Sequence, residues 1–202
     1  EPLTLERYSR ALGGAWLDGV HTFNRGTPDA SLFSARSHVL DLLNTTHVVS
    51  YRRLATSLAG SYGPETPHSE FWQPVFEQND AVIMRNNRAL PRAWLVGEAQ
   101  AVRMEVALDR IRGDSKSDFD PRQTALLEIN PNEMPSLPGG FLPPGSEARV
   151  VGYEPNRITI KTTSSQPSVL IVSELFFPGW EAWVDGKKTQ IQIANYLLRS
   201  VF

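Results

Sequence analysis

The sequence lacks cysteine entirely, and it also lacks any long hydrophobic run. Without cysteine, disulfide bonds, thiolate metal ligands and a cysteine nucleophile are all excluded, although the cellular compartment stays open. No apolar stretch approaches the roughly 18–20 residues of a membrane-spanning helix, and no signal-peptide pattern is present. The 202 residues are enough for one large domain or two small ones with a full hydrophobic core.

An excess of one charge is also missing, because 20 Lys and Arg residues face 22 Asp and Glu residues, giving a net charge of −2. This balance creates no field that would recruit nucleic acid, so no nucleic-acid partner is expected. The sequence contains no G-x-S-x-G, G-x-G-x-x-G or phosphate-loop motif. We therefore predict no catalytic residue and no cofactor for this chain.

The clearest pattern that is present lies in the carboxyl-terminal third. Residues 169–177 are nearly continuous apolar sequence, which is typical of a strand buried on both faces. The alternation that follows places Trp180 and Trp183 on opposite faces of a second strand. Asp185-Gly186 predicts a tight hairpin turn, because a type I′ turn needs positive φ at both central residues.

Helical and strand patterns alternate in the rest of the chain. Helical spacing of apolar residues is found over Leu3–Leu17, Ser31–Leu43 and Glu98–Ile111. Strand patterns predict one compact hairpin over residues 81–96 and another over residues 148–163.

The predicted fold class is mainly β, α+β overall: an antiparallel β-sandwich with an N-terminal helical segment and one further helix. The expected organisation is a helical segment over residues 1–60, a β-hairpin and helix region over 61–135, and a C-terminal sandwich portion over 147–202. We expect the last two regions to form one compact unit.

Asp118 and Asp120 are the only candidates for metal ligands that the spacing suggests. A D-x-D pair offers the hard oxygen ligands that suit Mg²⁺ or Mn²⁺. Pro121 follows directly, however, and Asp is favoured in turns because its side chain bonds to nearby backbone groups. We favour the turn and predict no metal site. The four histidines support this prediction, since no two have the spacing of a local metal site.

Tryptophans provide the candidates for ligand binding. Exposed indole faces stack on the C–H surfaces of sugars, so Trp183 and Trp72 are candidate glycan-binding residues. The alternative is burial in the core, which is usual for aromatic residues on strands and which we favour for Trp180. For Trp183 both interpretations stay open.

Both ends of the sequence indicate a piece of a longer protein. The chain begins at Glu1 rather than at methionine. It ends at Phe202 in an apolar strand that would expose an unpaired edge, so we expect a further strand beyond it.

Several blocks of the sequence, in this order, resemble the carboxyl-terminal extracytoplasmic region of the YfhO-type bacterial membrane proteins. The blocks are LLNTTHVVSYRR (Leu42–Arg53), NNRALPRAWLV (Asn86–Val96), FDPRQTALLE (Phe119–Glu128), ARVVGYEPNRITIKT (Ala148–Thr162), SELFFPGWEAWVDGKK (Ser173–Lys188) and NYLLRSVF (Asn195–Phe202). The resemblance covers most of residues 40–202. The most specific blocks are LPRAWLV and the pair PGW-x-A-x-VDG and ANYLLR.

The resemblance implies a polytopic membrane protein of the GT-C glycosyltransferase type. Such proteins transfer a sugar from a polyprenyl-phosphate carrier to a cell-surface polymer, with catalytic acidic residues in a loop near the first membrane spans. This chain would be the appended soluble domain, on the extracytoplasmic face of the bacterial cell membrane, and would carry no catalytic residue. Its expected partners are the membrane-embedded part of its own chain and a surface glycan or glycolipid.

Two other functions stay open. One is a stand-alone carbohydrate- or protein-binding β-sandwich module. The other is a metal-dependent enzyme that uses Asp118 and Asp120.

Overall fold

A computed structural model describes residues 2–13, 15–17, 20–22, 30–51, 71–79, 81–114 and 118–202. Strands account for 41% of the structure and helices for 16%, so the predicted mainly β, α+β class is confirmed. Part of the predicted helical N-terminal segment, including residues 23–29 and 52–60, lies outside the described residues.

The central sheet of the described residues has six strands. Their spatial order is β6 (Ala93–Val96), β11 (Val169–Leu175), β15 (Leu198–Val201), β14 (Gln192–Ala194), β8 (Thr124–Leu127) and β7 (Glu98–Ala101). Neighbouring strands are antiparallel except β7 and β8, which are parallel. Only Gly97 separates β6 from β7, although these strands occupy the two edges of the sheet. The sheet therefore curls until its edges meet at Gly97.

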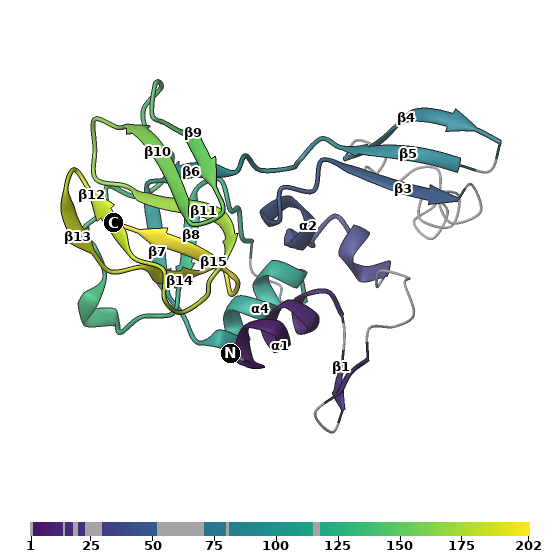
Figure 1. Cartoon of the computed structure of the whole chain (residues 1–202), viewed down its shortest axis with the longest axis horizontal. Coiled ribbons are helices and arrows are strands. Elements are labelled where there is room, and N and C mark those ends of the chain that lie inside the picture. The colour runs from purple at the N-terminus through teal and green to yellow at the C-terminus, as the bar shows by residue number, and fades with distance from the viewer. Residues whose placement is uncertain are drawn as a thin grey trace.

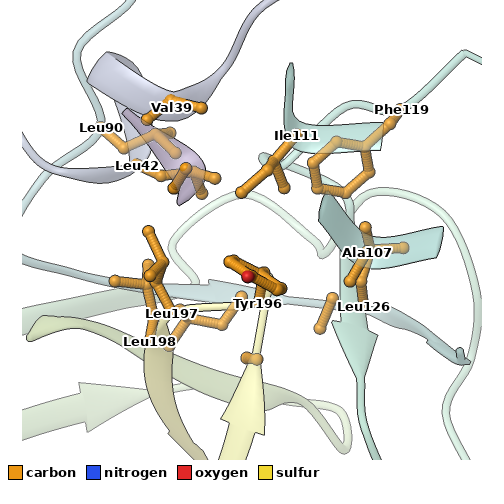
Figure 2. Packing of buried hydrophobic residues seen from close by; sticks show 14 of the residues in the cluster. Val39, Leu42, Leu90, Ala107, Ile111, Phe119, Leu126, Tyr196, Leu197 and Leu198 are labelled. Atoms are coloured by element: carbon orange, nitrogen blue, oxygen red, sulfur yellow. The ribbon is translucent and has the colours of Figure 1, made fainter. Parts of the chain in front are cut away.

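Helices cover one face of this sheet (Figure 1). They are α1 (Pro2–Ala11), the short α2 (Val39–Leu42) and α4 (Met104–Arg112), and buried side chains of all three belong to the main hydrophobic core. Figure 2 shows the centre of that core, where Leu42 and Ile111 from the helices face Tyr196 and Leu198. Tyr196 is the largest fully buried side chain among the described residues.

An ion pair fixes α1 to the sheet. Both terminal nitrogens of Arg7 donate to the carboxylate of Glu128, at 2.6 and 2.7 Å, and Arg7 Nη1 also donates to the carbonyl of Tyr196 at 2.9 Å. Two parallel charge-assisted hydrogen bonds are among the strongest side-chain contacts, and here both partners are largely shielded from water. The contact therefore sets the position of α1 over the core.

Smaller sheets lie around this unit. A three-stranded sheet of β3 (His47–Tyr51), β5 (Ala81–Asn86) and β4 (Trp72–Gln78) extends away from the core (Figure 1). In the described part of the chain, two-stranded hairpins are formed by β1 (Ala15–Leu17) with β2 (Val20–Thr22), β9 (Glu147–Glu154) with β10 (Arg157–Thr163), and β12 (Ala182–Val184) with β13 (Lys187–Thr189). The described residues also form the short 3₁₀ helices η1 (Ala30–Phe33) and η3 (Pro131–Glu133). The hairpin predicted over residues 148–163 is confirmed.

The compact hairpin predicted over residues 81–96 is wrong. β5 pairs with β3 and β4, whereas β6 pairs with β11, so that Trp94 lies opposite Ile171.

The helix predicted over Glu98–Ile111 is also wrong in its first part, because β7 pairs with β8 and α4 begins only at Met104. Tertiary pairing overrides local helix propensity there. Gly113 ends α4 as predicted, with a left-handed φ of 76°.

The helices predicted near the amino terminus are shorter than expected. α1 ends at Ala11, and Gly13 has a φ of 83°. In place of a helix over Ser31–Leu43, the described residues form η1 and α2 with a non-helical connection. Arg88 explains this break, because its guanidinium donates to the carbonyls of Ala35 and Ser37 at 2.5 and 2.7 Å. Those carbonyls would otherwise accept bonds within a helix.

Candidate functional site

Trp183 lies on the hairpin of β12 and β13 and is 57% exposed. The turn predicted at Asp185 and Gly186 is confirmed, with φ values of 50° and 80°. Trp183 pairs with Lys188 across the hairpin, and Lys188 Nζ is 5.9 Å from the indole centroid. Lys188 also forms an ion pair with Glu181. An open aromatic surface thus lies beside one hydrogen-bond donor and one acceptor, which suits a sugar ring with its hydroxyl groups.

Trp180 has a structural contact instead. The guanidinium carbon of Arg199 lies 4.1 Å from the Trp180 ring centroid, and Arg199 Nε donates to the carbonyl of Leu175 at 2.9 Å. Burial lowers the pKa of the Arg199 guanidinium, while the nearby Glu174 carboxylate opposes that shift. Trp180 is only half-buried, but this stacking fixes it against the central sheet.

Trp72 is not brought together with Trp183. It begins β4 and packs on Phe33, with ring centroids 5.4 Å apart, at the border of the core. β4 and β12 lie at opposite ends of the molecule (Figure 1). The two sequence-predicted glycan-binding residues therefore belong to different surfaces, and Trp183 is the more accessible one.

The carboxylate of Asp120 is engaged by its own turn. Its two oxygens accept hydrogen bonds from Arg122 N at 2.9 Å and from Gln123 Nε2 at 3.1 Å, and its carbonyl accepts from Thr124 N at 3.0 Å. Asp118 is exposed. Within the described ranges, no group of three or more His, Asp and Glu side chains is placed to hold a metal ion. The geometry around Asp120 is that of the turn favoured from the sequence.

A buried charge cluster at Asp41 could not be found from sequence spacing. Asp41 is 1% exposed, and its carboxylate lies 3.2 Å from Arg88 Nε and 3.1 Å from His38 Nδ1. Asn86 Nδ2 donates to the same carboxylate at 2.9 Å. Burial lowers the pKa of the Arg88 guanidinium, and the Asp41 charge opposes that effect. The cluster joins α2 to the end of β5, so it supports the fold rather than forming an open site.

A polar cleft of about 460 Å³ is the other feature that the sequence did not reveal. Its walls come from the connection between η1 and α2, from β7, from the C-terminal end of α4 and from the turn before β8. Glu98 and Gln100 belong to β7, which is an edge strand, and Arg110 of α4 contacts Gln100. No local motif joins these four segments, so spacing alone gives no signal for the cleft.

No family model, curated protein or solved structure matches this chain. None of the helices in the described parts of the chain is long and apolar enough to cross a membrane.

Proposed function

We propose that this chain is a non-catalytic, extracytoplasmic domain of a membrane glycosyltransferase of the YfhO type, and that it contacts surface glycan through Trp183. The parent protein would transfer sugar from a polyprenyl-phosphate donor to a cell-surface polymer. The main observation in support of a glycan contact is that the indole of Trp183 is exposed and has Lys188 beside it. The catalytic groups would lie in the membrane-embedded part of the parent.

The positions of the resembling sequence blocks support the domain assignment. LPRAWLV contains β6, SELFFPGWEAWVDGKK runs from β11 to β13, and NYLLRSVF contains β15. β6, β11 and β15 are adjacent in the central sheet although up to about 100 residues separate them in sequence. The blocks therefore build one folded unit, as a domain appended to a membrane protein requires.

A glycan array of bacterial surface polysaccharides, probed with the purified domain, tests the role of Trp183. Replacing Trp183 with Ala should weaken binding about two- to tenfold, because stacking on one aromatic ring supplies on the order of 0.5–1.5 kcal/mol. Val184→Ala is the matched control, since Val184 is the next residue and is also exposed, at 45%. It should leave binding unchanged.

The stability of the Trp183→Ala variant must be measured beside its binding. An exposed side chain contributes little to the fold, so the free energy of unfolding should change by less than about 0.5 kcal/mol. A large loss of stability, or full binding by the variant, would contradict the proposed glycan contact.

A further inference from the structure

The side chains along one wall of the polar cleft are held in a row by their own hydrogen bonds. Arg110 Nη1 donates to Gln100 Oε1 at 2.6 Å, and Gln100 Nε2 donates to Glu98 Oε1 at 3.0 Å. Each of the three side chains can form further hydrogen bonds with a ligand. A guanidinium carries five N–H donors, a carboxylate accepts up to about four hydrogen bonds, and the Gln amide has two N–H donors and an acceptor oxygen. The wall therefore presents donors and acceptors in fixed, alternating positions.

The charged side chains that line the cleft do not favour an anionic ligand. Glu98, Asp118 and Asp120 contribute three carboxylates, whereas Arg36 and Arg110 contribute two guanidinium groups. The C-terminal end of α4 also borders the cleft and adds the negative end of a helix dipole. A phosphate site needs the opposite balance, with positive groups or a helix N-terminus in excess. A neutral ligand fits this balance better.

The remaining groups of the cleft also suit a polar, uncharged ligand. Phe119 lines the cleft but is only 8% exposed, and its ring packs on the His38 ring in a T-shaped pair whose centroids are 5.7 Å apart. There is little apolar surface for an aliphatic or aromatic compound. The volume of about 460 Å³ falls within the range of small-molecule sites, about 300–1,000 Å³.

From these observations we propose that the cleft is a binding site for a single neutral sugar unit, separate from Trp183. Hydroxyl groups both donate and accept, so a ring carrying several of them matches the alternating wall of Glu98, Gln100 and Arg110. The choice of a sugar over another polyol rests on the proposed function. The cleft would then hold one unit of the glycan whose other contact is the β12–β13 hairpin.

Amide chemical shifts of the ¹⁵N-labelled chain test this site. The probes are D-glucose, D-galactose and N-acetyl-D-glucosamine, each titrated to about 50 mM because a site with few contacts binds weakly. Inorganic phosphate is the charged comparison. At least one sugar should shift the amides of residues 98–101, 110–113 and 118–124 in a saturable manner, and phosphate should not.

Gln100→Ala removes the central group of the wall and should lower the affinity about tenfold, since two hydrogen-bonding groups lose their fixed position. Gln166→Ala is the matched control, because Gln166 is exposed and lies outside the cleft. The Gln166→Ala variant should bind the sugar with the same affinity as the unchanged chain. Glu98→Gln, which preserves the size of the side chain, should also weaken sugar binding. This second variant keeps the proposal testable if Gln100→Ala fails to fold.

Saturable shifts of the cleft amides that Gln100→Ala or Glu98→Gln weakens would support the site. Shifts confined to the β12–β13 hairpin would overturn it while leaving the proposed role of Trp183 intact. Phosphate binding in the cleft, or no shift with any of the three sugars, would also overturn it.

Discussion

Asn195 and Leu126 exchange two hydrogen bonds across the central sheet. Asn195 N donates to the Leu126 carbonyl at 2.7 Å, and Leu126 N donates to the side-chain Oδ1 of Asn195 at 2.9 Å. Asn195 has a left-handed φ of 49°, so its backbone turns away from β8 just after β14. Its amide side chain therefore continues the hydrogen-bond ladder where the backbone no longer can.

Asn195→Ala should lower the free energy of unfolding by about 2–3 kcal/mol, because the buried Leu126 N–H loses its acceptor and Ala tolerates a left-handed φ poorly. Urea denaturation followed by tryptophan fluorescence measures the change. Asn130→Ala is the control: Asn130 also accepts a backbone hydrogen bond, from Asn132 N, but in an exposed turn. Equal losses in the two variants would contradict the role given to Asn195.

Tyr196 should make the stability depend on pH in the alkaline range. Burial raises the pKa of its phenol, although the nearby Arg10 and Arg7 charges oppose the shift. Above about pH 10 the unfolded chain loses this proton while the folded chain retains it, so stability falls as pH rises, by at most about 1.4 kcal/mol per pH unit.

Tyr196→Phe isolates this effect. Within the described residues the Tyr196 hydroxyl has no hydrogen-bond partner, so the variant should match or exceed the stability of the unchanged chain at neutral pH. Urea denaturation of both proteins at neutral pH and near pH 11 tests the prediction. The same pH dependence in both proteins would show that Tyr196 is not its source.

Asp41→Asn should lower the free energy of unfolding by about 3 kcal/mol or more. The substitution leaves the Arg88 guanidinium largely buried without its counter-charge. Thermal and urea unfolding measure the loss. Asp114→Asn is the matched control, because Asp114 pairs with Arg112 at 3.2 Å but its side chain is 55% exposed. That variant should lose less than about 1 kcal/mol, and a comparable loss would refute the importance of the buried cluster.

Gly97→Ala should destabilise the point where the edges of the central sheet meet. A Cβ at Gly97 would lie 2.8 Å from the carbonyl oxygen of Gly140, and Gly139 N donates to the Gly97 carbonyl at 3.0 Å. We expect a loss of about 1–3 kcal/mol, since a backbone atom must move to make room. Gly152→Ala, whose Cβ would meet Thr159 at an ordinary 3.4 Å, should cost much less. If both substitutions are tolerated equally, the close approach is not a constraint.

The sequence predicted those features that depend on a few neighbouring residues. The Asp185-Gly186 turn, the hairpin of β9 and β10 and the end of α4 at Gly113 follow from local φ preferences and alternation. Strand partners were not predictable, because β6 pairs with a strand about 75 residues later. β7 resembled a helix by composition, and only its pairing with β8 makes it a strand.

The candidate sites also differ in how far the sequence could predict them. Exposure of Trp183 was one of two open alternatives, since alternation places a residue on a face but does not say what covers that face. The polar cleft and the Asp41 cluster combine residues from different secondary-structure elements, such as Gln100 of β7 with Arg110 of α4, and Asp41 of α2 with Arg88. Such contacts arise only once the chain has folded.

The most direct test of the central proposal is an immunoblot of fractionated native cells with an antibody raised against this domain. If the domain belongs to a membrane glycosyltransferase, the antibody should detect a band far above 22.5 kDa in the membrane fraction. A soluble band near 22.5 kDa would contradict the proposal and favour a stand-alone binding module.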